Sequence, residues 1–134
     1  MPSDREVVVP PDWHDFYEST GIPAAVRIGD TLRLTGHTGT RADGSFPANV
    51  TEQIRQTFQN IADTLTYAGY EWADVVEITS YHVGLQAQAE ALMTVAAEFI
   101  DRPFPAWSAV GVIDFFEAEA VVEITCVASN DRAE

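Results

Sequence analysis

A single apolar stripe over residues 49–68, near the middle of the chain, most constrains what this sequence can fold into. Apolar side chains recur there at steps of four, four, three, four and three residues, at Val50, Ile54, Phe58, Ile61, Leu65 and Ala68. This spacing predicts a helix with one buried face. Asn49 with Glu52 resembles a capping box at its start, and Gly69 is a C-terminal stop signal.

Short β-rich runs lie on both sides of this helix. Residues 25–28 and 31–35 flank a Gly-Asp pair and predict a hairpin, after an optional strand at 7–9. Residues 75–83, 107–113 and 120–128 predict three further strands. A second helix is expected over about 86–100, with Ala89, Leu92, Met93, Ala96 and Phe99 on one side, because Pro103 and Pro105 prevent its continuation.

The resulting order, β-β-α-β-α-β-β, predicts one α+β domain with two helices packed on one face of an antiparallel-to-mixed sheet. The other face would carry Thr, Val, Ile and Tyr side chains, which favours a partner subunit. We expect an N-terminal arm at 1–20, pinned to the core by Trp13, Phe16 and Tyr17, a domain at 21–130 and a C-terminal tail at 131–134.

Charge excludes several function classes. The chain carries seven basic and 21 acidic residues, for a net charge of −14, and all seven basic residues are arginine. Without lysine the chain cannot form a Schiff base with a carbonyl compound or build a Walker-type phosphate site. The scattered arginines argue against binding of nucleic acid.

No signal peptide or membrane-length apolar stretch is visible in the sequence, so we expect a cytoplasmic protein with no membrane partner. Cys126 is expected to be a small buried side chain.

Several stretches resemble the RidA/YjgF family in their order and spacing over about residues 22–129. They are Ala25-Val26-Arg27-Ile28-Gly29-Asp30, Leu34-Thr35-Gly36-His37, the helix from Gln53 through Asn60-Ile61, Leu65 with Ala68-Gly69, Asp74-Val75-Val76, Phe104-Pro105-Ala106-Trp107-Ser108 and Val121-Val122-Glu123-Ile124. The resemblance implies a chorismate-mutase-like fold, assembled as a homotrimer with three clefts between subunits. It also implies hydrolysis of reactive enamines and imines without a metal or organic cofactor, so we expect no cofactor here.

The chain departs from the family at the cleft. Active members place an arginine after the Pro-Ala of this motif to bind the substrate carboxylate, and here that position is Trp107. An indole cannot pair with a carboxylate, although its face can attract a cation. Ile22 and Leu92 stand where the family often has tyrosine and asparagine, which makes the pocket less polar. With Trp107 and its neighbour Ser108, these residues are the predicted ligand contacts.

Glu123 matches the family's glutamate that positions or activates water. It is predicted to share a strand face with Val121, Thr125 and Val127, where it acts as a general base or as a structural carboxylate. Gly36 would let the backbone approach a ligand closely. His37, where the family commonly has glutamine, is either a replacement acid/base or a strand-end histidine with one hydrogen bond. The three histidines have no metal-binding spacing.

Two functions from different classes remain. One is a divergent enamine/imine deaminase, or a related hydrolase acting on a substrate without a carboxylate. The alternative is a non-catalytic trimer that binds a small metabolite in the same clefts. Arg27 and Arg33 lie on the predicted hairpin, and the sequence leaves open whether either replaces the missing cation, because side-chain direction depends on strand register.

Overall fold

The computed structural model describes residues 4–130. Its elements are β1 (Arg5–Val8), a 3₁₀ turn (Pro11–Trp13), α1 (His14–Thr20), β2 (Ala25–Ile28), β3 (Thr31–Leu34), α2 (Val50–Tyr67), a 3₁₀ turn (Trp72–Asp74), β4 (Val75–His82), α3 (Leu85–Phe99), β5 (Ala106–Gly111) and β6 (Val122–Ser129). The predicted tail at 131–134 lies outside the described residues.

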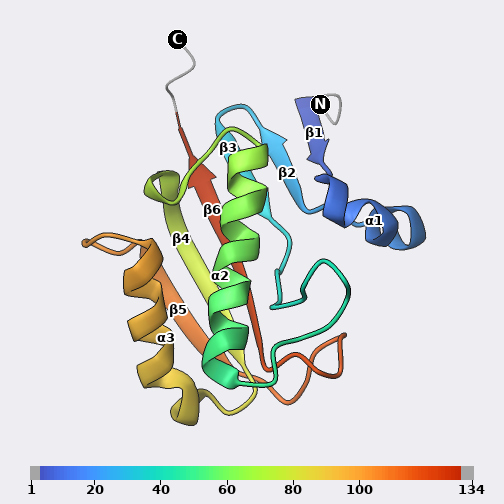
Figure 1. Cartoon of the computed structure of the whole chain (residues 1–134). Helices are drawn as coiled ribbons and strands as arrows, with labels where there is room; N and C mark the ends of the chain where they lie inside the picture. The colour runs from blue at the N-terminus through green and yellow to red at the C-terminus, as the bar shows by residue number, and fades with distance from the viewer. Residues whose placement is uncertain (1–3, 131–134) are drawn as a thin grey trace.

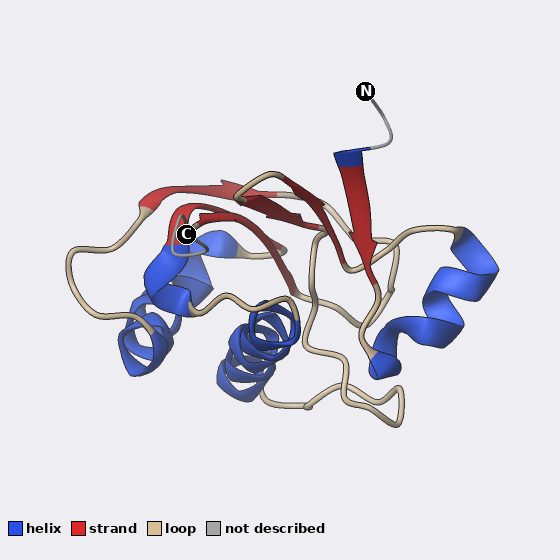
Figure 2. Cartoon of the chain, turned by 90° about the horizontal axis from the view of Figure 1, so that it is seen from above, coloured by secondary structure: helices blue, strands red, loops and turns tan. Residues whose placement is uncertain are grey.

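One six-stranded sheet organises the described chain, in the order β1-β2-β3-β6-β4-β5. β4 and β5 are parallel and joined through α3, whereas the other pairs are antiparallel. Helices α2 and α3 cover one face of the sheet and leave the other face open (Figures 1 and 2). The α+β domain with a mixed sheet and two helices on one face is therefore confirmed.

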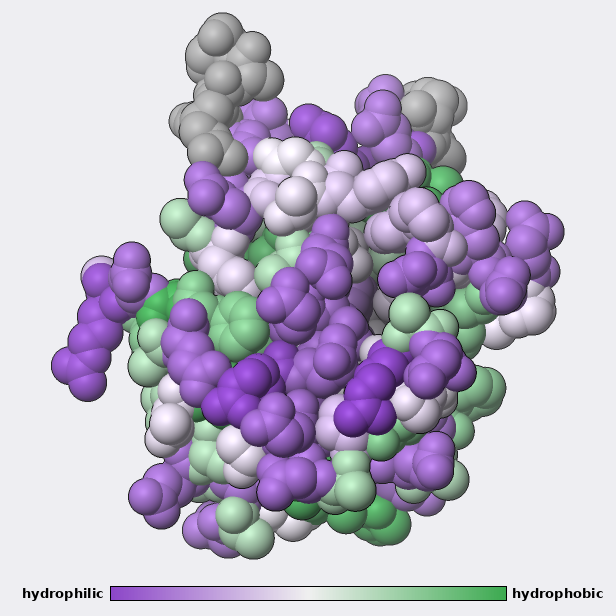
Figure 3. Space-filling view, viewed as in Figure 1, coloured by the Kyte–Doolittle hydropathy of each residue, from purple (hydrophilic) through white to green (hydrophobic). Residues whose placement is uncertain are grey.

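Helix α2 follows the periodicity of its sequence. The Asn49 side chain accepts a hydrogen bond from the backbone N–H of Glu52 at 3.0 Å, and Gly69, with φ of +89°, follows the helix end. The apolar stripe is buried in the core except at Val50, which lies in the exposed first turn, and at Ala68, which is half-buried just after the helix end. The outer side of α2 is polar (Figure 3), and Arg55 there pairs with Glu98 of α3 at 2.6 Å.

The structure corrects two details of the predicted pattern. Residues 14–20 form a short helix, α1, within what was expected to be an arm with at most one strand. In α3, Leu92 and Ala96 are buried as predicted, but Ala89 and Met93 are exposed, and Gln88 and Val95 are buried instead. Helix α3 is rich in alanine and apolar on most sides, so its sequence does not define a narrow stripe.

Trp13 joins the N-terminal segment to the sheet. Its indole packs on the ring of His37 with the centroids 4.8 Å apart, and its Nε1 donates to the carbonyl of Ile22 at 2.9 Å. Phe16 contacts the edge of the same indole at 5.5 Å. The expectation that aromatic residues pin this segment is confirmed for Trp13. Within residues 4–130, no helix combines the length and apolar character needed to cross a bilayer.

Candidate functional site

A small corner forms on the open face of the sheet just after β3. There the chain makes an isolated antiparallel bridge to β6: the His37 N–H donates to the carbonyl of Ile124 at 2.8 Å, and the Ile124 N–H donates back at 2.9 Å. Because His37 and Ile124 are both buried on the helix side, their neighbours in this register face the other way. Gly36 and Thr38 therefore share the open face with Glu123.

Glu123 lies against the backbone of Gly36. A Cβ atom on Gly36 would stand 2.1 Å from Oε2 of Glu123, so glycine is needed for the carboxylate to occupy this place. Partial burial raises the pKa of Glu123 above its ordinary value, and the negative charge of Glu117 raises it further. Across β4, Tyr81 is its register partner on the same face. The register confirms that Glu123 shares a face with Thr125 and Val127, whereas Val121 precedes the strand and packs against the core.

Glu117 brings a second carboxylate to this corner. The hydroxyl of Thr38, which is opposite Glu123 in the bridge register, donates to Oε1 of Glu117 at 2.7 Å. Thr40 donates to Oε2 at 3.3 Å. The Asn60 amide holds the threonine loop by donating to the carbonyls of Thr38 and Thr40, each at 2.8 Å. No sequence pattern pointed to Glu117, because residues 112–121 form an irregular connection without periodicity.

His37 is placed as a structural residue. Its side chain is 1% exposed, and its Nδ1 lies 2.7 Å from the carbonyl oxygen of Thr35, so Nδ1 carries the proton. Nε2 then accepts a hydrogen bond from the hydroxyl of Thr64 at 2.8 Å. Burial lowers the pKa of His37 to about 4. Of the two readings of His37, the structure supports the structural one, because the ring is neutral and turned away from Glu123.

Trp107 lies on the helix-covered face of the sheet. It pairs with buried Ile78 in the register of β4 and β5, and its Nε1 donates to the hydroxyl of Ser80 at 3.0 Å. Its indole packs near Phe58 and Phe104, with ring centroids 6.3 and 5.9 Å away. A single chain therefore holds Trp107 and Glu123 on opposite faces of the sheet, and it does not bring these two predicted site residues together.

The other predicted ligand contacts are scattered. Leu92 is 3% exposed and belongs to the core between the helices and the sheet, so it lines no surface of the single chain. Ser108 is exposed and pairs with Thr79. Ile22 is partly exposed and follows α1, where its carbonyl holds Trp13. Of the predicted site residues, only Gly36 and Glu123 lie against each other, on the open face of the sheet.

The two hairpin arginines have different surroundings. The guanidinium of Arg27 lies over the ring of Tyr70, 5.5 Å from its centroid. Arg33 lines a shallow cavity of about 260 Å³ on the open face, together with Glu77 and Thr79 of β4 and residues 125–127 of β6. Arg33 pairs with Val127, four residues along β6 from Glu123, which is about 13 Å at the usual rise of a strand.

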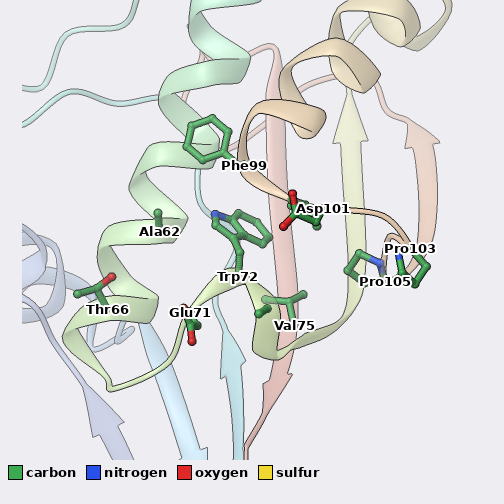
Figure 4. A pocket seen from close by; sticks show the side chains of 11 residues that line it. Ala62, Thr66, Glu71, Trp72, Val75, Phe99, Asp101, Pro103 and Pro105 are labelled. Atoms are coloured by element: carbon green, nitrogen blue, oxygen red, sulfur yellow. The ribbon is translucent and has the colours of Figure 1, made fainter.

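A larger cavity, of about 500 Å³, lies where α2 and α3 end. Trp72 lies in the middle of its lining beside Phe99, and Asp101, Pro103 and Pro105 line it further along (Figure 4). This cavity contains none of the predicted site residues. Among residues 4–130, no three His, Cys, Asp or Glu side chains are grouped so that they could hold a metal ion.

The comparisons decide the family. A family model described as Endoribonuclease L-PSP matches residues 19–130. The chain is also 38% identical over 110 residues to the RutC family protein YjgH of Escherichia coli strain K12, covering 81% of this chain and 84% of that protein. The chain belongs to the RidA/YjgF family.

Two further comparisons show the range of this RidA/YjgF protein's relatives. A solved structure of protein YJGH superimposes with a TM-score of 0.84 and 36% identity, and covers 94% of this chain and 96% of that one. A 2-iminobutanoate/2-iminopropanoate deaminase of Dermatophagoides farinae is 29% identical over 107 residues, covering 75% of this chain and 83% of that enzyme. The relatives of this chain therefore include a protein named as a deaminase of 2-iminobutanoate and 2-iminopropanoate.

Proposed function

We propose that this RidA/YjgF protein is a homotrimer that hydrolyses the C=N bond of a small imine without a carboxylate. The observation that carries the proposal is the carboxylate of Glu123: it lies against Gly36 on the open face, and partial burial raises its pKa. A carboxylate with a raised pKa is a better general base near neutral pH. The family's imine deaminase relative supports the reaction class.

The reaction needs one water molecule and one base. Glu123 accepts a proton from water while the oxygen attacks the imine carbon, and it returns that proton to the nitrogen, which gives a neutral carbinolamine. The hydroxyl proton of the carbinolamine then passes to the nitrogen as the C–N bond breaks and the carbon–oxygen double bond forms, so that ammonia leaves. The balance is imine plus water to carbonyl compound plus ammonia, so the reaction consumes no oxidant or reductant.

Exposed apolar side chains support self-association. Ile113 is 91% and Phe116 is 89% exposed on the loop that leads to Glu117, and Val7, Ile28 and Val110 are also exposed on the sheet. A surface with several exposed apolar side chains is usually covered by a partner. Subunit contacts at this face would place each Glu123 in a cleft between two subunits. The β5 edge that carries Trp107 would then come from the neighbouring subunit. Light scattering after gel filtration should give three times the 14.7 kDa of one chain, and a monomer mass would refute the trimer.

An imine-hydrolysis assay tests the reaction. An amine oxidase generates imines from simple amines, an amino-acid oxidase generates imino acids, and the rate of carbonyl release is measured with and without the protein. Glu123→Gln should lose at least about 100-fold in activity on the amine-derived imines. Glu119→Gln is the matched control, because Glu119 is exposed on the same connection and its loss leaves Glu123 in place.

The same assay tests the role of Trp107. Activity on imino acids should be low, because no arginine follows the Pro-Ala motif to pair with their carboxylate; an ion pair of this kind is typically worth about 2–5 kcal/mol. Rates on imino acids equal to those on amine-derived imines would show that another group, such as Arg33 of a neighbouring subunit, binds the carboxylate.

One observation favours the non-catalytic alternative. His37 is buried and neutral, so its ring cannot act as the acid that protonates the leaving nitrogen. A protein that binds a metabolite at Glu123 without turnover would bind small amines or carbonyl compounds in calorimetry and release no carbonyl product from any imine. That pair of results would replace hydrolysis by binding.

A further inference from the structure

We propose that Glu117 makes this site select a positively charged substrate, an imine bound as its iminium ion. The inference rests on the proposed hydrolysis at Glu123 and names the class of compound that this site takes. It depends on the arrangement of three groups: Glu117, Glu123 and the indole that stands at the position of the expected cation.

The first step is the position of Glu117. The bridge between His37 and Ile124 places Thr38 opposite Glu123, and the Thr38 hydroxyl donates to Glu117. The carboxylate of Glu117 is thus held one side chain away from Glu123 on the same open face. The Asn60 amide fixes the loop that carries Thr38, so the second carboxylate is fixed rather than free to turn away.

The second step is the charge of the surroundings. The pKa of Glu123 responds to the negative charge of Glu117, and no cation of residues 4–130 contributes to that shift. The arginine expected after Pro105-Ala106 is Trp107, which faces the helices, and Arg33 lies about 13 Å along β6. Within one chain, the groups beside Glu123 therefore have the opposite charge from those that bind an imino acid.

The third step is chemical. Two neighbouring carboxylates stabilise the protonated form of a bound imine, and the iminium carbon is the electrophile that water attacks. The balanced reaction is R–CH=NH₂⁺ + H₂O → R–CHO + NH₄⁺, in which the site releases the same single positive charge that it took up. Such a substrate is the product of oxidation of a primary amine, and the aldehyde then passes to an enzyme that oxidises or reduces carbonyl compounds.

Binding of two probes of equal shape tests the charge preference apart from turnover. Choline and 3,3-dimethylbutan-1-ol differ chiefly in the positive charge, and neither is hydrolysed. Calorimetry on the assembled wild-type protein at low salt should show that choline binds about tenfold more tightly than the alcohol. The difference comes from the attraction between the positive charge and the carboxylate of Glu117, which solvent screens in part. Because salt screens exposed charges, the preference should shrink at about 0.5 M NaCl.

Glu117→Gln keeps an oxygen that can accept from Thr38 but removes the charge, so its preference for choline should fall to about twofold or less. Glu119→Gln removes one charge from the same connection and should keep the tenfold preference. Equal binding of both probes by the wild type, or a full preference kept by Glu117→Gln, overturns the inference. If Glu117→Gln does not assemble, the salt dependence of the wild type decides.

The two proposals fail separately. A clear choline preference with no carbonyl release from any imine refutes the hydrolysis and leaves the charge selection standing. Hydrolysis of neutral and cationic imines at equal rates, without a choline preference, refutes the charge selection and leaves the hydrolysis standing.

Discussion

Mild acid should destabilise this protein through His37. Its pKa is lowered from 6.5 to about 4 in the folded chain because the ring is buried. The unfolded chain binds a proton below pH 6.5 and the folded chain does not, so stability is fully present above pH 6.5 and is lost as the pH falls towards 4. At about 1.4 kcal/mol per pH unit, the loss between pH 7 and pH 5 is about 2 kcal/mol.

Urea unfolding at pH 7 and pH 5, at one fixed protein concentration, measures this loss. The matched variant is His37→Gln, because an amide can donate to the Thr35 carbonyl and accept from the Thr64 hydroxyl as the neutral ring does. The wild type should lose about 2 kcal/mol more than the variant between the two pH values. His82, whose pKa is also lowered by burial, and Glu123 titrate in both proteins and cancel in this difference.

Equal losses in the two proteins would refute the reasoning. They would mean that the folded state accepts a proton on His37 near pH 6, either because water reaches the ring or because a subunit contact stabilises the imidazolium. His37 would then return as a candidate acid for the leaving nitrogen, and the structural assignment would be wrong.

Four smaller predictions follow from single contacts. Gly36→Ala should abolish imine hydrolysis but lower the free energy of unfolding by only about 1 kcal/mol, because its Cβ displaces the movable end of Glu123. A variant that keeps its hydrolysis rate, or that fails to fold, would contradict this. Gly39→Ala should cost about 3 kcal/mol or more in urea unfolding, since its Cβ would stand 2.5 Å from the backbone oxygen of Gln53. Asn49→Ala should lower stability by about 1 kcal/mol through loss of the helix cap, and no change would show that the cap is redundant. Cys126 should resist thiol reagents in the native protein and react on unfolding, because burial raises its pKa to about 12; rapid native labelling would refute its burial.

The sequence predicted the fold well because local and long-range signals agreed. The stripe on α2, its cap at Asn49 and its stop at Gly69 each indicated the same helix, and the turn at Gly29-Asp30 indicated the hairpin that the structure has. Helix α1 was missed because seven residues give two turns at most, too few for a periodic pattern. The contact that anchors the segment before it, Trp13 on His37, joins residues distant in the sequence and leaves no local pattern.

The geometry of the candidate site could be predicted from the sequence only in part. Gly36 and Glu123 could be found because the resemblance marked their positions and strand alternation gave the face of Glu123. Glu117 could not be found, since its place depends on hydrogen bonds to Thr38 and Thr40, which lie 77 or more residues earlier in the chain. A contact of this kind has no local pattern, and only the folded register brings the two loops together.

Trp107 shows where position in a motif and position in space differ. Its motif position is that of a ligand-binding arginine, but strand register turns its indole towards Phe58 and Ser80, on the opposite face from Glu123. If both positions belong to one site, they must come from two different subunits, because the sheet separates them within one chain. In the proposed cleft, Trp107 would therefore supply no cation from the neighbour's half, while Glu117 would contribute an anion to the other half. Both features would favour negative charge in the cleft, and so the choline comparison tests them together with the assembly.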